Sequence, residues 1–412
     1  PYVRRDGKLI AVSWADAFDA IANRIQSVDG ARIAAIAGDL VDAEAMVALK
    51  DLMGALGSQN IDCRQDGAKL DPEVRASYLF NSGIAGIEDS DALLLIGTNP
   101  RWEAPLINAR IRKRWLVGNY SIGLVGERRD LTYQTDHLGA GPESLRDILN
   151  DGAFSDALKK AQRPMLIVGQ GSLARPDGAA ILDLARELAE KYGFITDDWN
   201  GFNVLHTAAA RVGGLDLGFV PGPNGQDVSG ILAGVESGTI EVVYLMGADE
   251  LDMKRLQKAF VIYQGHHGDA GAAGADVVLP GAAYTEKAGT YVNTEGRVQR
   301  ALRAAFPPGE AREDWAIVRA LSERLGHQLP YDTLEQVRER LVAVAESFGE
   351  PDVLPRQPWK TFGVAGETTA QPFVTPIADF YLTNAVSRAS VTMNQCSASY
   401  GAHGQPGTGT DG

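Results

Sequence analysis

The sequence predicts an α/β fold of doubly wound, mostly parallel sheets with helices on both faces. Apolar runs that each stop at a glycine recur along the chain, at 33–37, 93–96, 165–168 and 242–246. Each run is followed by polar residues, and the 46 glycines among 412 residues suit many tight strand-to-helix turns. Fully apolar runs of this length are typical of parallel strands buried on both faces. Any ligand is therefore expected at the carboxyl ends of the strands.

Taken in order, the chain begins with a ribbon whose turn is Asp6-Gly7, followed by a helix capped at Ser13. Apolar spacing predicts further helices at about 42–56, 106–115, 177–192, 314–325 and 333–347. The predicted regions are a ribbon and helix packing on the body (1–30), a first doubly wound α/β unit (31–160), a second α/β unit (161–348), an extended, proline-rich surface arm (349–400) and a disordered tail (401–412). The boundary between the two units is placed near Arg163-Pro164, although no clear linker precedes it.

The amino-acid composition argues against several classes of function. A hydrophobic content of 45% with 22% charged residues is typical of a soluble globular protein. The formal net charge of -14 argues against nucleic-acid binding, which needs a surplus of Lys and Arg. The sequence contains no run of 18 apolar residues, so no membrane-spanning helix is predicted. No apolar core follows the N-terminal basic pair, which argues against a signal peptide, and a cytosolic chain is expected. Because the sequence starts at Pro1, we expect a piece of a longer protein.

The two cysteines, Cys63 and Cys396, lie far apart and without metal-ligand spacing. Two cysteines cannot supply the ligands of an iron-sulfur cluster or a structural zinc site. Both are predicted to be reduced, structural thiols. His206, His266 and His267 are likewise interpreted as structural rather than catalytic or metal-binding.

Residues 276–299 are the most informative stretch. The apolar run 277–279 ends at Pro280 and predicts a buried strand. The polar residues that follow, punctuated by glycines, predict a long loop rather than further strands. Leu279-Pro280, Glu286, Gly289-Thr290, Asn293 and Glu295-Gly296-Arg297-Val298-Gln299 together resemble the molybdopterin-dependent oxidoreductase superfamily. In that superfamily this loop lies beside the pterin nucleotide, and the resemblance implies the fold of formate dehydrogenase/DMSO reductase domains 1–3.

Two glycine turns follow predicted strands. Gly97-Thr98-Asn99-Pro100 is similar to a turn that cradles a nucleotide in molybdopterin enzymes, and a helix N-terminus beyond it suits a phosphate. The alternative is that Asn99-Pro100 ends a strand and Pro105 starts a helix. The second turn, Gly169-Gln170-Gly171-Ser172, lacks the third glycine and the lysine of nucleotide-binding motifs. A nucleotide-binding regulator that uses both turns is kept as a weaker hypothesis.

Four basic residues stand in five positions, Arg110, Arg112, Lys113 and Arg114. Their alternation with apolar residues predicts a helix with a solvated outer face. Contact with an acidic partner subunit is the alternative.

Several stretches resemble the large iron-sulfur subunit (the G or 75 kDa type) of proton-translocating NADH:quinone oxidoreductase, respiratory complex I. They are residues 84–91, 108–113, 264–269, 379–384 and 387–390. In that subunit the N-terminal part carries 2Fe-2S and 4Fe-4S clusters, and the C-terminal part keeps the molybdopterin-enzyme fold without its cofactor. The chain matches only the C-terminal part.

The chain differs from the active molybdopterin enzymes at two points, and both differences favour the cofactor-free subunit. Cys63 comes several residues before the position of their metal ligand, and the final barrel domain that closes over the pterin has no counterpart. We therefore expect no catalytic, cofactor-binding or metal-binding residue in this fragment. The vestigial pterin-site positions are Gly97, Asn99, Pro100, Glu286, Asn293 and Arg297. Arg297 and Glu286 are expected to serve as internal hydrogen-bond or ion partners, and Gly289 and Gly296 as turn formers.

The resemblance implies a structural and assembly role within the peripheral arm of complex I, on the cytoplasmic side of a bacterial inner membrane or the matrix side of a mitochondrial one. The partners would be other subunits of that arm, and the chain itself would neither span the membrane nor bind nucleic acid. Electrons would pass from NADH to quinone through clusters outside this chain. The alternative hypothesis is an active molybdopterin-dependent oxidoreductase fragment.

Overall fold

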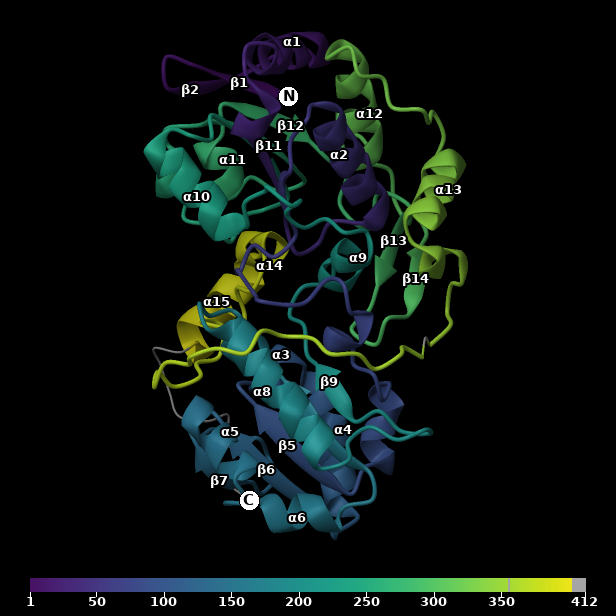
Figure 1. Cartoon of the computed structure of the whole chain (residues 1–412). Helices are drawn as coiled ribbons and strands as arrows, with labels where there is room; N and C mark the ends of the chain where they lie inside the picture. Colours follow the sequence, from purple (N-terminus) through teal and green to yellow (C-terminus); the bar gives the residue numbers. More distant parts are fainter. Residues whose placement is uncertain (355, 402–412) are drawn as a thin grey trace.

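The computed structural model describes residues 1–354 and 356–401. Two main sheets form an upper and a lower lobe in Figure 1, with the C-terminal helices between them. The strands are β1 (Tyr2–Arg5), β2 (Lys8–Ala11), β3 (Ile33–Ala37), β4 (Asn60–Asp62), β5 (Ala92–Ile96), β6 (Ser121–Val125), β7 (Asp136–Gly139), β8 (Pro164–Val168), β9 (Phe202–Val204), β10 (Val242–Met246), β11 (Phe260–Gly265), β12 (Val277–Pro280), β13 (Gly289–Val292) and β14 (Val298–Ala301).

The helices that cover these sheets are α1 (Trp14–Ile25), α2 (Ala43–Ala55), α3 (Pro100–Glu103), α4 (Pro105–Leu116), α5 (Pro142–Leu149), α6 (Ser155–Lys160), α7 (Gln170–Leu173), α8 (Gly178–Lys191), α9 (Arg211–Asp216), α10 (Val228–Ser237), α11 (Ala270–Gly274), α12 (Asp314–Arg324), α13 (Leu334–Val344), α14 (Ala385–Ala389) and α15 (Val391–Tyr400). Within the described residues, no helix is both long and apolar enough to cross a membrane.

The upper sheet has the order β2-β1-β12-β11-β10-β3-β4. Strands β12, β11, β10, β3 and β4 are parallel, and the N-terminal ribbon adds an antiparallel edge. Along β3 the buried side chains alternate between two cores: Ala35 and Ala37 pack with α1, α2 and α12, whereas Ala34 and Ile36 pack with α10. Helices therefore cover both faces, as the unbroken apolar runs predicted.

The lower sheet has the order β7-β6-β5-β8-β9 and is parallel throughout. Leu93 and Leu95 of β5 pack on one face with Ile107 and Ile111 of α4. The opposite face packs against α5 and α8. The predicted doubly wound α/β architecture with mostly parallel sheets is confirmed.

The sheets divide the chain differently from the predicted boundary at residues 160/161. Strands β5 and β8, on either side of that boundary, are hydrogen-bonded neighbours in one sheet. In the sequence, the whole lower sheet, residues 92–204, lies between β4 and β10, two strands of the upper sheet. Strand spacing along a sequence does not reveal this arrangement, because each strand-turn-helix unit looks alike whichever sheet it joins.

The N-terminal ribbon and helix follow the prediction. Ser13 caps α1 by accepting a hydrogen bond from Asp16 N at 3.1 Å, and Asp16 completes a capping box. The stretch 276–299 corrects the prediction of a single long loop, because β13 and β14 form an antiparallel hairpin with Val292 paired to Val298. Four-residue strands next to glycine and polar residues give too short a pattern to recognise.

The C-terminal region departs in part from the predicted surface arm. Residues 350–384, apart from 355, form neither helix nor strand and run across the middle of the molecule (Figure 1). Residues 385–400 are helical instead, forming α14 and α15. Of the predicted disordered tail 401–412, all but Gly401 lie outside the described residues.

Candidate functional site at the carboxyl edges of the sheets

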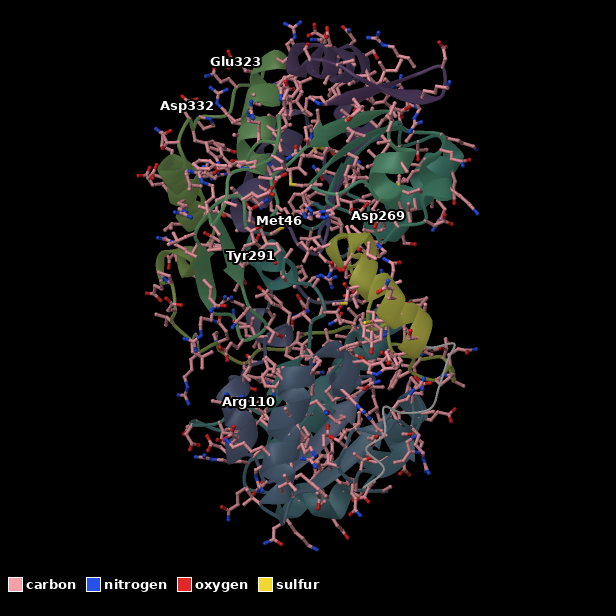
Figure 2. The ribbon with its side chains drawn as sticks, turned by 180° about the vertical axis from the view of Figure 1, so that it is seen from behind. Met46, Arg110, Asp269, Tyr291, Glu323 and Asp332 are labelled. Atoms are coloured by element: carbon pink, nitrogen blue, oxygen red, sulfur yellow. The ribbon has the colours of Figure 1, made fainter. Side chains whose placement is uncertain are left out.

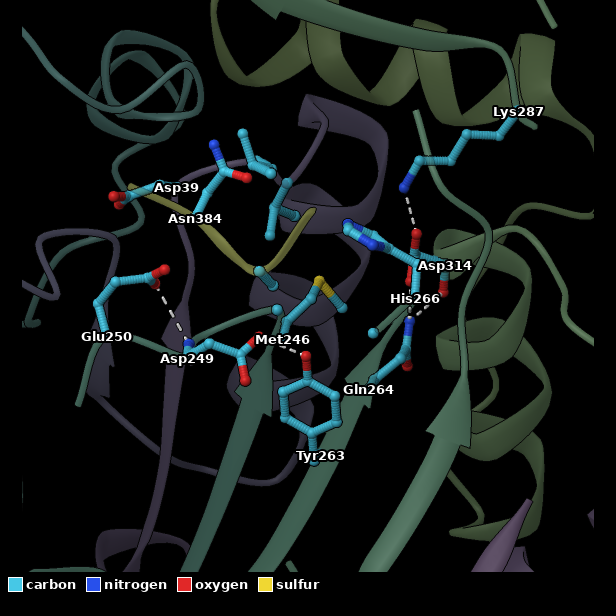
Figure 3. Close-up of a pocket in the computed structure, with 15 residues that line it drawn as sticks. Asp39, Met246, Asp249, Glu250, Tyr263, Gln264, His266, Lys287, Asp314 and Asn384 are labelled. Carbon is cyan, nitrogen blue, oxygen red and sulfur yellow. Dashed lines mark hydrogen bonds and ion pairs between the residues drawn. The ribbon is translucent and has the colours of Figure 1, made fainter. Parts of the chain in front are cut away.

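The carboxyl ends of β3, β10 and β11 meet at one edge of the upper sheet, where a doubly wound fold places its ligand site. A cavity there has a volume of about 30 Å³, enough for about two water molecules. It is lined by Asp39, Leu40, Val41, Met246, Gly247, Asp249, Glu250, Tyr263, Gln264, Gly265, His266, Lys287, Asp314, Asn384 and Ala385 (Figure 3). The last two of these belong to the C-terminal segment.

Asp249 is held by two donors at this edge. The Tyr263 hydroxyl donates to Asp249 Oδ2 at 2.5 Å, and the backbone N–H of Gly271 donates to Asp249 Oδ1 at 2.9 Å. Burial raises the pKa of Asp249 and, more strongly, that of Tyr263, since both lose solvation in their charged forms. Both groups are committed to the internal network rather than presented to a ligand.

Lys287 is a fully buried ammonium beside the same cavity. Its Nζ lies 2.6 Å from Asp42 Oδ2 and also contacts Asp314 Oδ2. Gln264 donates to Asp314 Oδ1 at 2.8 Å, which completes a network seen on the right of Figure 3. The two carboxylates outweigh the cost of burial and raise the pKa of Lys287. This ion triad joins the N-terminus of α2, the loop before β13 and the start of α12.

A second buried network surrounds Arg211, whose residue exposure is only 2%. Its guanidinium donates to Asp66 Oδ1 at 3.0 Å. Asp39 lies close by, and burial raises the pKa of its carboxyl to about 6 against the opposing effect of Arg211. Asp39 Oδ1 has no hydrogen-bond partner among the described residues.

At the lower sheet, the two predicted glycine turns pack on each other. Gly97 has φ +57°, and a Cβ placed on it would lie 2.5 Å from Ser172 Cβ. A Cβ on Gly169 would lie 2.6 Å from Gly97 O. Asn99 N donates to Glu103 Oε1 at 2.7 Å, and Pro100 is buried as the first residue of α3. The contacts leave these turns facing protein instead of an open phosphate cradle.

The C-terminal segment 371–389 crosses both carboxyl edges. Above the lower sheet, the Val374 carbonyl oxygen lies 2.3 Å from where a Gly171 Cβ would be, and Thr375 Oγ1 donates to Glu103 Oε1 at 3.2 Å. At the upper sheet, Arg388 donates to Asp269 Oδ2 at 2.6 Å and to Glu250 Oε1 at 2.7 Å. Asp269 lies beside the yellow C-terminal helices in Figure 2. The C-terminal segment therefore contacts the carboxyl edges of both sheets.

The remaining predicted positions lie in the loop and hairpin after β12. Glu286 Oε2 accepts from Ala283 N at 3.0 Å, and Asn293 Oδ1 accepts from Arg297 N at 3.0 Å. Arg297 pairs with Glu295 at 3.0 Å, and Gly296 adopts φ +82° in the hairpin turn. Gly289 is the first residue of β13 rather than a turn former. None of the six predicted positions lines the cavity of Figure 3.

The other candidate residues are held in structural contacts. His206 is half-buried, with its Nε2 2.6 Å from the Tyr78 carbonyl oxygen, and loss of solvation lowers its pKa to about 4. Burial also raises the pKa of the Cys63 thiol to about 12. Arg110 and Lys113 of the basic run both pair with Glu88. Among the described residues, no three His, Cys, Asp or Glu side chains are grouped so as to hold a metal ion.

Most polar side chains that line the cavity are bonded to neighbouring residues: Tyr263 to Asp249, Gln264 to Asp314 and Lys287 to Asp42. A groove of about 1070 Å³ adjoins the same edge, with Gly265, His266 and Glu286 among its lining residues. The segment 371–389 contacts both carboxyl edges. Sequence reasoning missed Asp39, Asp249, Lys287 and Arg388. For the first two a signal was present, because each follows closely on a glycine that ends a predicted strand.

Comparison with known proteins shows which families the chain matches. The molybdopterin oxidoreductase family matches residues 1–324, and the C-terminal family of the G subunit of NADH-ubiquinone oxidoreductase matches residues 356–396. Two solved structures share the fold: a chain of the formyltransferase/hydrolase complex from Methylorubrum extorquens (TM-score 0.57, 19% identity, 78% of this chain and 98% of that one) and acetylene hydratase from Pelobacter acetylenicus (TM-score 0.53, 13% identity, 85% and 64%).

Relatives of higher identity agree with one another. The G subunit of NADH-quinone oxidoreductase from Rickettsia felis is 42% identical over 398 residues, which cover 96% of this chain and 57% of that protein. The mitochondrial 78 kDa subunit of NADH-ubiquinone oxidoreductase from Neurospora crassa is 43% identical over 416 residues, covering 97% and 54%. The chain therefore spans little more than half the length of these relatives, and the predicted resemblance to the large iron-sulfur subunit is confirmed. On the match over residues 1–324, the chain belongs to the molybdopterin oxidoreductase family.

Proposed function

We propose that this chain is the cofactor-free structural part of the large iron-sulfur subunit of an NADH:quinone oxidoreductase. It supports electron transfer from NADH to quinone that is carried by iron-sulfur clusters outside this chain, and it performs no chemistry itself. The observation that carries the proposal is that residues 371–389 lie across the carboxyl edges of both sheets and are bonded there to Glu103, Glu250 and Asp269. The names of the relatives, subunits of NADH-quinone and NADH-ubiquinone oxidoreductases, supply the assembly.

The contacts of the C-terminal segment at these edges favour a scaffold over an active molybdopterin enzyme. In a doubly wound fold, substrates and cofactors bind where the carboxyl ends of the strands open to solvent. Here Thr375, Asn384 and Arg388 occupy those edges, where Thr375 bonds to Glu103 and Arg388 to Glu250 and Asp269. A pterin nucleotide would have to displace these contacts and the ion triad at Lys287.

As a scaffold, the chain would join other subunits of the peripheral arm of complex I, on the cytoplasmic face of a bacterial membrane or the matrix face of a mitochondrial one. Surface contacts then matter more than any internal cavity. The six vestigial positions, Gly97, Asn99, Pro100, Glu286, Asn293 and Arg297, keep the turns and the hairpin in shape.

The test is metal and pterin analysis of the tagged, full-length protein purified within its assembly. Molybdenum and tungsten are measured by mass spectrometry and oxidised pterin by fluorescence, each per mole of the chain. We expect both to stay far below one to one. A molybdopterin enzyme produced in the same cells is the control that the cofactor was supplied. Stoichiometric metal and pterin on the chain would establish the alternative, an active oxidoreductase fragment.

Membership of the assembly is tested separately. NADH-dependent quinone reduction is expected to co-purify with the tagged protein. Its loss from the tagged fraction, with the chain intact, would contradict the proposal.

A further inference from the structure

One exposed stretch stands out for its apolar character, Leu302 to Pro308, here named the 302–308 arm. Leu302 is 83% exposed and Phe306 79%, and Ala304, Ala305 and Pro308 are also exposed. Single exposed apolar residues are common on soluble proteins, but a contiguous run marks an interaction site. Both large side chains of the arm face mainly solvent.

The arm is held in place by the backbone. Ala304 N and Ala305 N both donate to Thr285 O, at 2.9 and 3.0 Å. This pair of bonds brings the arm beside Tyr284, which is 53% exposed. At its two ends the arm continues from β14, which pairs with β13, and leads to α12. A fixed apolar surface loses little conformational entropy on binding, so it suits a stable interface.

Two arginines, Arg303 within the arm and Arg300 just before it, place positive charge at this surface. Arg300 and Arg303 are exposed, and neither forms an ion pair with any described residue. The Arg303 guanidinium lies over the Phe306 ring, 4.5 Å from its centre. Aromatic and arginine side chains together are the composition of interface hot spots. In a chain of net charge -14, this arm is a locally cationic and apolar surface.

The predicted basic run on α4 makes a useful contrast. Arg110 and Lys113 are both paired with Glu88, and Arg114 donates to the Ser90 carbonyl oxygen at 2.8 Å. Their charge is therefore largely satisfied within the chain, unlike that of Arg300 and Arg303. Arg300 and Arg303 have no such carboxylate partner among the described residues.

A groove of about 1070 Å³ runs beside the arm. Its walls include Tyr2, Ala283, Glu286, Pro308, Glu310 and Ala311. The end of the arm thus forms one edge of a groove with room for several apolar or neutral side chains of a bound segment. Because Asp16, Glu286 and Glu310 line the groove, the carboxylates of such a segment are expected over Arg300 and Arg303 instead.

We propose that the 302–308 arm, with Arg300 and Arg303, docks a segment of another subunit of the assembly that carries carboxylates next to an apolar side chain. The carboxylates pair with the two arginines, and the apolar side chain packs on Leu302 and Phe306. A second copy of this chain fits less well, because a two-fold contact through the arm would bring the arginines of both copies together. This inference rests on the proposed function, since it needs the assembly.

The experiment places a photo-cross-linking amino acid at Leu302 in the tagged, full-length protein, purified in its assembly. The matched control carries the same group at Val364, which is 66% exposed and lies on a different segment. We expect the cross-link from position 302 to reach an acidic segment of another subunit, identified by mass spectrometry, with at least tenfold less from position 364. Arg300→Glu with Arg303→Glu should reduce the cross-link about tenfold, and the double lysine variant should retain most of it.

The outcomes separate the two proposals. If the assembly purifies but position 302 cross-links to nothing, to its own chain, to a second copy or to lipid, the docking inference is wrong and the proposed function stands. If the charge-reversed and lysine variants cross-link equally, the charge argument fails and the inference with it. If no other subunit accompanies the tagged chain, both proposals fail.

Discussion

Arg388 Nε lies 2.6 Å from Asp269 Oδ2, although 119 residues separate the two in the chain. The same guanidinium also reaches Glu250, so one side chain of α14 bonds to two acidic residues at the edge of the upper sheet. Through this contact the C-terminal segment closes over part of the carboxyl edge, where a doubly wound fold binds its ligands.

Replacing Arg388 with alanine should loosen that closure. Both charge-assisted bonds are lost, and each side chain involved is only about a quarter exposed, so the loss is expected to be on the order of 1–3 kcal/mol in local stability. Hydrogen exchange across residues 376–401 should speed up by tenfold or more, and Arg388→Lys should restore part of the protection. Arg5→Ala, at an exposed arginine, is the control. Unchanged exchange in Arg388→Ala would show that the segment is held by other contacts.

Lys287→Met should be strongly destabilising. The variant leaves Asp42 and Asp314 buried without their shared cation, which typically costs about 3–5 kcal/mol. Chemical denaturation of the protein measures the loss. Adding Asp42→Asn and Asp314→Asn to Lys287→Met should recover much of it, since no buried charge then remains unpaired. A triple variant no more stable than the single one would refute the ion-triad interpretation.

Deprotonation of the Asp39 carboxyl should lower the free energy of unfolding as pH rises. Its pKa is raised to about 6 in the folded state from 3.8, so the folded state binds the proton more tightly. Its contribution to stability is complete below about pH 4 and is lost as pH rises through about 6. Asp39→Asn should therefore increase the free energy of unfolding at pH 7.5 by roughly 1–3 kcal/mol and have little effect at pH 4. Asp197→Asn, at an exposed position, is the control and should change neither value. A destabilising Asp39→Asn at pH 7.5 would mean that the carboxylate is needed beside Arg211.

Gly97→Ala tests whether a vestigial pterin-site position now serves the fold. Its φ of +57° disfavours any side chain, and the new Cβ would lie 2.5 Å from Ser172 Cβ. We expect a loss of at least ~2 kcal/mol in unfolding experiments. Ser172→Gly in the same chain should remove the side-chain contact but neither the 2.8 Å contact with the backbone N of residue 172 nor the backbone strain, so only part of the stability returns. Full tolerance of alanine at 97 would argue that the turn keeps space for a ligand.

Much of the fold could be predicted because its signals are local. The runs at 33–37 and 242–246 are apolar on both faces, and this property alone identifies buried parallel strands. Ser13 and Asp16 encode the start of α1 within four residues. By contrast, the pairing of β5 with β8 and of β3 with β10 depends on contacts between distant segments, so the boundary near residue 160 was misplaced.

The candidate site was harder to predict for the same reason. Lys287 stands in the motif that the sequence singled out, yet its importance comes from Asp42 and Asp314, which no spacing connects to it. Arg388 lies in a tail whose composition gives no hint of burial against the upper sheet. The motif residues themselves, such as Asn293 and Arg297, bond mainly within their own hairpin turn.

In the sequence, the strands of the lower sheet all lie between β4 and β10 of the upper sheet. This arrangement affects the order in which the protein can fold. During synthesis, β3 has only β4 beside it until β10 leaves the ribosome, after all of residues 92–204 have been made. The lower sheet draws every strand from one continuous stretch, so it can form first. The upper sheet is completed later, and an interrupted synthesis would leave β3 with an unpaired edge that invites aggregation.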